Sequence, residues 1–163
     1  MYDAAVPVAL QALDRALALL DHATPAMLAA RLHPDMFSCA EQFEITAGFA
    51  LRATLPLIGR AVTEQETLHD REALRVHLLA AQSEIKALKP EDFAGVEDRR
   101  IVHRAGFADL DQSAQEYLQH FAIPNLWFHL SMAFAILRAE GAPVSKADFD
   151  GLHVYPPGFS WVK

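Results

Sequence analysis

The segment PNLWFHLSMAFAILRAEG (residues 124–141) constrains the fold of this chain more than any other stretch. Its initial proline, and the Gly-Ala-Pro sequence at its end, predict a helix over residues 124–140. Between residues 126 and 137 only His129 and Ser131 are polar. A helix that is apolar on nearly every side is central in a helical protein. The segment therefore predicts a helical core with this helix at its centre.

Three further helices are predicted from apolar residues that recur at spacings of three and four. The first ends between His22 and Pro25, the second begins after a cap at Asp35 and closes at Pro56 and Gly59, and the third runs over about residues 67–88. The stripes of the first and third helices consist of Val6, Leu10, Leu13, Leu17 and Leu20, and of Leu74, Leu78, Ala81, Ile85 and Leu88.

The segment KPEDFAGVEDRRIVHRAGFADLD (residues 89–111) breaks the helical pattern. Its Pro, Gly and clustered charges predict a long crossover, and Ile101 to His103 suggests a small hairpin within it. Asp111 is expected to cap a short helix that follows. The fold class is therefore an all-α four-helix bundle with a long crossover before the last helices, in a single domain of residues 1–163. The tail is expected to lie on the surface, anchored by Phe159 and Trp161.

Composition excludes several function classes. The chain has 163 residues, a formal net charge of −7 and basic residues scattered along its sequence. This pattern argues against nucleic acid and membrane partners. A lone cysteine, Cys39, fits a reducing compartment and is expected to be a small buried core residue. Without a signal-peptide pattern, the expected location is the cytoplasm.

Asn125 and His129 lie four residues apart, on one face of the central helix. Each buried polar side chain needs a partner. In a functional interpretation the partner is a ligand or metal, with Gln42 and His77 converging from neighbouring helices. In a structural interpretation Asn125 bonds to the preceding turn and His129 bonds to a neighbouring side chain or a trapped water. For His77 itself, a surface position is expected.

Three blocks carry a family resemblance: ARLHPDMFSCAEQF, FAGVEDRRIV and YLQHFAIPNLWFHLSMAFAILRAEGAPVSKADF. In order and spacing they resemble the bacterial domain-of-unknown-function family numbered 1993. That family is similar to the DinB/YfiT-like superfamily of four-helix bundles. Many superfamily members bind a divalent metal, and some transfer or isomerise groups using a low-molecular-weight thiol.

The superfamily's metal site uses a histidine on the second helix and an H-x-x-x-H pair on the last one. Aligned by the shared ILRAEG ending, the second histidine of the pair falls on His129. The first falls on Asn125, and the second-helix position falls near Gln42. The resemblance therefore implies a divalent metal as cofactor, and His129 is the one matching ligand.

Two hypotheses about function remain open. In the first, the chain is a divergent thiol-dependent transferase or metalloenzyme with a small pocket, in which His129 is the general base and Asn125, Gln42 and His77 bind the ligand. In the second, it is a non-enzymatic, homodimeric small-ligand binding or interaction protein, and the Asn125/His129 cluster is structural. Outward-facing Val76 and Leu79 favour a homodimer. Arg99 and Arg100 either bind an anion at the pocket mouth or pair with Glu97 and Asp98.

Overall fold

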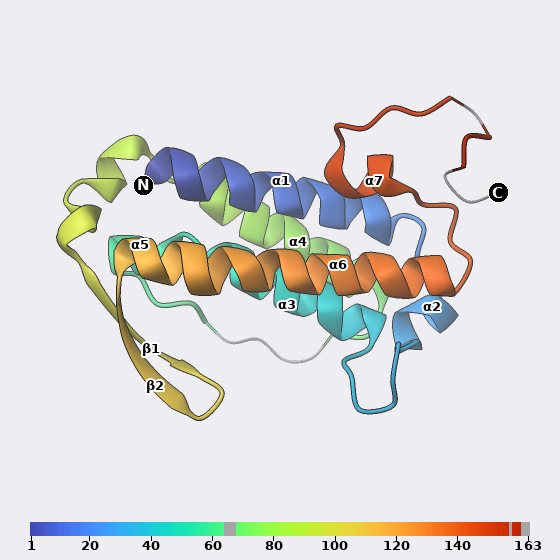
Figure 1. Ribbon diagram of the computed structural model, residues 1–163, viewed down its shortest axis with the longest axis horizontal. Coiled ribbons are helices and arrows are strands. Elements are labelled where there is room, and N and C mark those ends of the chain that lie inside the picture. The colour runs from blue at the N-terminus through green and yellow to red at the C-terminus, as the bar shows by residue number, and fades with distance from the viewer. Residues whose placement is uncertain (64–67, 157, 161–163) are drawn as a thin grey trace.

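The computed structural model of the protein describes residues 1–63, 68–156 and 158–160. Long helices that pack side by side form its body (Figure 1): α1 (Tyr2–Leu20), α3 (Cys39–Arg52), α4 (Arg71–Lys86) and α6 (Ile123–Ala139). Helix α3 packs against α6 and α4, and α1 packs against α4, α3 and α6. Their facing sides share one apolar core, which includes Leu13, Phe43, Leu78 and Leu130.

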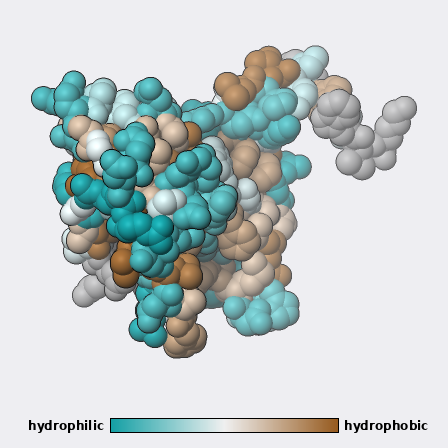
Figure 2. All heavy atoms as spheres, turned by 60° about the vertical axis from the view of Figure 1, so that its left-hand side comes forward, coloured by the Kyte–Doolittle hydropathy of each residue, from teal (hydrophilic) through white to brown (hydrophobic). Residues whose placement is uncertain are grey.

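The chain is mostly helical, and the prediction of an all-α fold is wrong in one respect. Strands β1 (Arg100–Ala105) and β2 (Ala108–Ser113) form an antiparallel hairpin. The hairpin projects from one end of the helices in Figure 1, and the crossover before it contains the 3₁₀ turns η2 (Pro90–Phe93) and η3 (Val96–Asp98). The suggestion of a hairpin around Ile101 to His103 is confirmed. Figure 2 shows that hydrophilic residues cover most of this end of the molecule.

Two predicted helix caps are wrong. Ser38, not Asp35, begins α3: its hydroxyl accepts from the backbone N–H of Glu41, while the Glu41 carboxylate accepts from the backbone N–H of Ser38 at 2.7 Å. This reciprocal capping box satisfies donors that would otherwise be orphaned. Ser113, not Asp111, caps α5 (Ala114–Glu116) in the same way, through Glu116.

The predicted last helix does not begin as a separate helix at Pro124. Helix α5 continues through η4, a π-helical segment (Tyr117–Ala122), directly into α6. Proline has no N–H to donate to a carbonyl one turn earlier, which explains the widened turn just before it. By length and composition alone, the helix Ala114–Ala139 could cross a membrane, and it is the one such helix in the described part of the chain. The α6 part of this helix packs against α3, and this packing accounts for its apolar residues that lie in the core.

The remaining elements are short. Helix α2 (Pro25–Ala29) and helix α7 (Lys146–Asp150) were not predicted, and η1 (Leu55–Ile58) follows α3. Helix α4 begins after a cap at Asp70, whose carboxylate accepts from the N–H of Ala73 at 2.8 Å. The predicted start of this helix at Thr67, and the predicted anchor Trp161, lie outside the described residues.

Candidate functional site: a pocket beside His129

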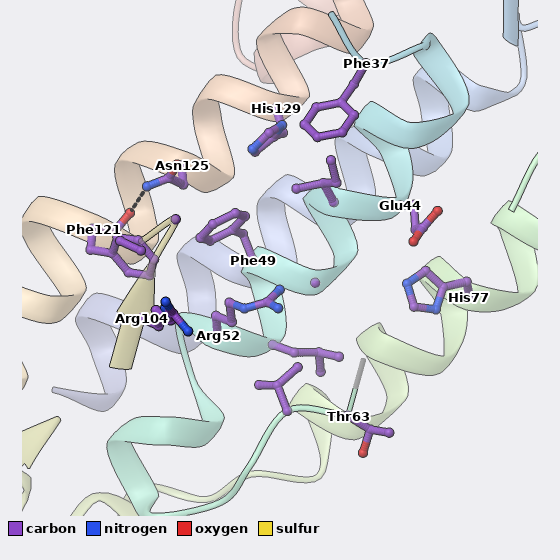
Figure 3. Close-up of a pocket in the computed structure, with 16 residues that line it drawn as sticks. Phe37, Glu44, Phe49, Arg52, Thr63, His77, Arg104, Phe121, Asn125 and His129 are labelled. Atoms are coloured by element: carbon purple, nitrogen blue, oxygen red, sulfur yellow. Dashed lines mark hydrogen bonds between the residues drawn. The ribbon is translucent and has the colours of Figure 1, made fainter. Parts of the chain in front are cut away.

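A pocket of about 530 Å³ opens between α3, α6, α4 and the hairpin. Figure 3 shows its labelled side chains, with His129 and Asn125 on α6 and Phe49 and Arg52 on α3. The walls are aromatic near His129 and charged toward the two ends. They include Phe37, Phe49 and Phe121, the cations Arg52 and Arg104, and the pair Glu44 and His77.

His129 is held in the pocket wall by stacking and by one hydrogen bond. Its ring lies 5.5 Å from the Phe49 ring, at an interplanar angle of 14°. Nδ1 lies 2.8 Å from Oε1 of Gln42, which is 1% exposed. Because this amide oxygen can only accept, Nδ1 carries the proton and Nε2 is left as an acceptor. Within the described residues Nε2 has no protein partner, and it is not enclosed as His103 Nδ1 is.

Burial keeps the His129 imidazole neutral. The residue is 7% exposed, and desolvation lowers the pKa of His129 from 6.5 to about 4. At neutral pH the ring is therefore uncharged, with a bare Nε2. Such a nitrogen is a good hydrogen-bond acceptor.

Asn125 is not directed at a ligand through its amide nitrogen. Its Nδ2 donates to the backbone carbonyl of Phe121 at 2.8 Å, in the π-helical segment (Figure 3). The structure therefore brings His129 and Gln42 into contact with each other but ties Asn125 to its own helix. Both bonds correspond to the structural interpretation of the pair, while Nε2 of His129 remains available.

His77 lies in the pocket wall, and the expectation of a surface position is wrong. It is 7% exposed and faces Glu44 across the end of the pocket away from Arg52 and Arg104 (Figure 3). Desolvation lowers the pKa of His77, and the charge of Glu44 partly opposes that shift. Glu44 also accepts a hydrogen bond from the backbone N–H of Leu68 at 3.0 Å. This end of the pocket is therefore polar.

Sequence reasoning missed the aromatic wall and its cation. Phe49 follows Gln42 by two helical turns, so the spacing placed both on one side of α3. From the sequence, Arg52 lies off the apolar stripe of the second predicted helix, which gives no sign of a contact with Phe49. Its guanidinium instead lies over the Phe49 ring, 5.3 Å from the centroid. Phe121 packs edge-on against Phe49 at 5.6 Å. A histidine stacked on Phe49, an edge-on Phe121 and an arginine thus form one aromatic wall.

The residues of the pocket do not fit a divalent metal. His129 is the one imidazole at its end of the pocket, with His77 and Glu44 at the other end. Gln42 Oε1 is engaged by His129, and the Asn125 nitrogen by a carbonyl. Transition metals favour several imidazole, thiolate or carboxylate ligands. Across the part of the chain that the structure describes, no three His, Cys, Asp or Glu side chains are grouped to hold an ion. The sole cysteine, Cys39, is fully buried in the core, as expected.

The arrangement of helices and hairpin is that of the DinB-like class of fold, as a comparison with a solved structure shows. A DinB family member protein from Shewanella denitrificans, solved by crystallography at 1.83 Å, superposes with a TM-score of 0.84. It is 24% identical over 95% of this chain and 94% of its own. The chain belongs to the family described as domain of unknown function DUF1993, whose model matches residues 1–150. None of the curated proteins matches it.

Proposed function

We propose that the pocket binds a small organic molecule that donates a hydrogen bond to Nε2 of His129 and stacks against the aromatic wall. The observation that carries this proposal is the bare Nε2 of a neutral imidazole, in a pocket of about 530 Å³. Pockets of this size, mostly apolar with a few oriented polar groups, are typical of small-molecule sites. Gln42 fixes the tautomer, so the acceptor is always presented to the pocket.

Binding is favoured over base catalysis by the basicity of His129. A general base works best when its pKa lies near the operating pH. The imidazole here has a pKa of about 4, whereas a free thiol has a pKa of about 8.5. Proton transfer from a bound thiol to this nitrogen is therefore strongly uphill.

A divergent thiol-dependent transferase is the second candidate, and the availability of Nε2 at the one position matching the superfamily ligand pattern favours it. In that case His129 would accept a hydrogen bond from the thiol, and Gln42 would orient His129. The imidazole supplies only this contact, and the donor set gives no support for a metal. Turnover of a thiol-dependent group transfer by metal-free protein would establish it over simple binding.

The binding proposal is tested with phenol and toluene, which differ mainly in one O–H donor. We expect wild-type protein to prefer phenol by about fivefold, the worth of one neutral hydrogen bond. The His129→Phe variant keeps an aromatic ring but loses the acceptor, so its preference should vanish. Asn125→Leu is the matched control, because its amide nitrogen bonds to its own helix, and it should keep the preference. Equal affinities in wild type, or a preference that survives in His129→Phe, would refute the proposal.

We further propose that the protein is a DinB/YfiT-like four-helix bundle that acts in the cytoplasm as a homodimer through α4. Val76 and Leu79 on this helix are 59% and 45% exposed. Light scattering should give a mass near twice 18.0 kDa, falling to the monomer in Val76→Glu/Leu79→Glu. Val102→Glu, at a 76% exposed position on the hairpin, should leave the mass unchanged. A monomeric wild-type protein at high concentration would contradict the dimer.

A further inference from the structure

A second cavity, of about 580 Å³, adjoins the aromatic pocket and is lined by five arginines. It lies between β1, the end of α3 and the turn that follows η1. We call it the arginine cleft, and its cations are Arg52, Arg60, Arg99, Arg100 and Arg104. The chain has 14 Lys and Arg and a net charge of −7, so the fold concentrates scarce positive charge here. The sequence alone showed these residues as scattered.

Carboxylates neutralise three of the five arginines. Arg60 pairs with Glu84 at 2.5 Å, Arg100 with Asp111 at 2.9 Å, and Arg104 with Asp109 at 3.8 Å. The predicted pairing of Arg99 and Arg100 with Glu97 and Asp98 is wrong. Arg52 and Arg99 have no carboxylate partner among the residues that the structure describes, and both are half-buried. Two guanidinium groups thus face one cleft without an ion-pair partner among the described residues.

Both of these arginines pack against neighbouring residues of the cleft. Nη1 of Arg99 lies against the point where a Cβ on Gly59 would stand, so a side chain there would displace the guanidinium. Gly59 also has a φ of 78°, in the left-handed region. Arg52 lies over Phe49, and its backbone carbonyl accepts from the Tyr117 hydroxyl at 3.0 Å. The Arg52 guanidinium thus lies over an aromatic ring, and the Arg99 guanidinium lies over a glycine.

A buried acceptor in the cleft wall also lacks a partner. His103 bonds to Gln112 through Nε2 at 2.8 Å, and its ring packs between Tyr117 and Phe121. Its Nδ1 is enclosed and, in the described part of the chain, unbonded. Buried polar atoms in folded proteins nearly always have a partner. Because this nitrogen is enclosed and can only accept a hydrogen bond, an anion in the cleft cannot be its partner, and contacts to an anion are left to the arginines.

The arginine cleft and the aromatic pocket share Arg52, Arg104, Phe121 and Val62 in their walls. From this geometry we propose that the arginine cleft binds the anionic group, a phosphate or carboxylate, of the small molecule whose body occupies the aromatic pocket. The proposal rests on the proposed function and names its ligand class. Guanidinium groups suit both anions, because they donate two parallel hydrogen bonds in a fixed fork.

Calorimetric titration with phenyl phosphate, phenylacetate and benzyl alcohol at low salt tests this assignment. We expect one or both anions to bind wild-type protein at least about tenfold more tightly than the neutral alcohol, a ratio typical of charge-assisted hydrogen bonds. The tighter of the two anions identifies the source as phosphate or carboxylate. In Arg52→Gln/Arg99→Gln the preference should fall to about twofold or less.

Arg75→Gln is the matched control, because Arg75 pairs with Asp21 outside both cavities. It should keep the full preference. The proposal would be overturned if Arg52→Gln/Arg99→Gln kept an anion preference of the same size, or if Arg75→Gln lost the preference as well. It would also be overturned if the anions bound wild-type protein no better than benzyl alcohol. If removing Arg52 impairs folding, the single variant Arg99→Gln tests the proposal instead, because it leaves the contact between Arg52 and Phe49 intact. Its preference for the anions should then fall below that of wild-type protein.

Titration with inorganic phosphate separates this proposal from the proposed function. The arginine cleft predicts phosphate binding in wild type and in His129→Phe alike, lost in Arg52→Gln/Arg99→Gln. If wild-type protein binds phosphate but shows no preference for phenol over toluene, the anion site stands and the role of His129 is refuted. If it prefers phenol but does not bind phosphate, the role of His129 stands and the anion site is refuted.

Discussion

His129 on α6 and Gln42 on α3 face each other across the core, and Nδ1 of the histidine donates to Oε1 of the glutamine over 2.8 Å. His129 thus bonds to an amide near the second-helix position where the resemblance implied a metal ligand, and in the described part of the chain its Nε2 is left as an acceptor without a protein partner. The surroundings of His129 are those of a hydrogen-bonding site rather than a set of metal ligands.

Introducing histidines at the two remaining positions of the superfamily pattern should create metal binding. In Gln42→His/Asn125→His, three imidazoles occupy the positions of the superfamily pattern, and we expect about one Zn²⁺ per chain. Wild-type protein and Gln42→His alone should retain almost none after dialysis. Elemental analysis of protein purified without a histidine tag measures this. Stoichiometric zinc in the wild-type protein would contradict a pocket built for hydrogen bonding.

Acid should destabilise the protein through His129 within a defined window. Above pH 6.5 the imidazole is neutral in the folded and the unfolded chain. Between pH 6.5 and about 4 only the unfolded chain binds the proton, since burial lowers the folded pKa of His129 to about 4. The free energy of unfolding therefore falls as the pH falls through this window, by up to about 3 kcal/mol. Below pH 4 both states are protonated and the loss stops.

Urea denaturation of wild type and His129→Gln, repeated across this window, isolates the effect. Carboxylates whose pKa is lowered, such as Asp150, titrate in both proteins. The difference between the two proteins should therefore change between pH 6.5 and 4 and stay constant outside it. A constant difference throughout would mean that the imidazole is not buried in its neutral form.

Substitution at Gly59 should weaken anion binding as well as stability. Gly59→Ala and Gly106→Ala both place a side chain at positive φ, 78° and 59°, at a cost of about 1–2 kcal/mol each. Only at Gly59 would the new Cβ collide with Arg99, because nothing lies within 4 Å at Gly106. Both variants should therefore unfold at lower urea, but only Gly59→Ala should bind phenyl phosphate more weakly. Equal affinities of the two variants for phenyl phosphate would show that Arg99 is not part of the anion site.

Cys39 should react only when the protein unfolds. It is 0% exposed, and burial raises the pKa of its thiol to about 12. The thiolate is the reactive species, so labelling by a disulfide reagent should require global opening. The labelling rate should rise with urea in parallel with the unfolded fraction. Rapid, complete labelling of folded protein would show that the helix packing around Cys39 opens locally.

The helices could be predicted where the sequence carries explicit start and stop signals. The last helix was predicted over residues 124–140 and α6 is Ile123–Ala139, with Gly141 marking its end, but the helix that contains it already begins at Ala114 through α5 and η4. At α3 the Asp35 cap was wrong although the Ser38 and Glu41 capping box was visible in the sequence. Asp35 and Ser38 are both residue types that cap helices, and the reciprocal hydrogen bonds between Ser38 and Glu41 favour Ser38.

The site was predictable only in part, for a physical reason. Helical periodicity places Gln42 and His129 on inward faces, so their meeting follows from packing two apolar stripes. The arginine cleft depends instead on the hairpin lying near enough to the end of α3 for both to line one cavity. No local pattern encodes that contact, and Arg52 and Arg99 therefore looked unrelated. His77 was misplaced because its position at the edge of a stripe is compatible with either face.

The proposed role of His129 is tested most sharply by a two-bond ¹H–¹⁵N correlation spectrum of labelled protein at neutral pH, with His129 assigned by comparison with His129→Gln. We predict a neutral ring with the proton on Nδ1, a bare Nε2, and a shift of the Nε2 resonance alone when phenol is added. A proton on Nε2, or an Nε2 resonance that phenol leaves unmoved, would contradict that role.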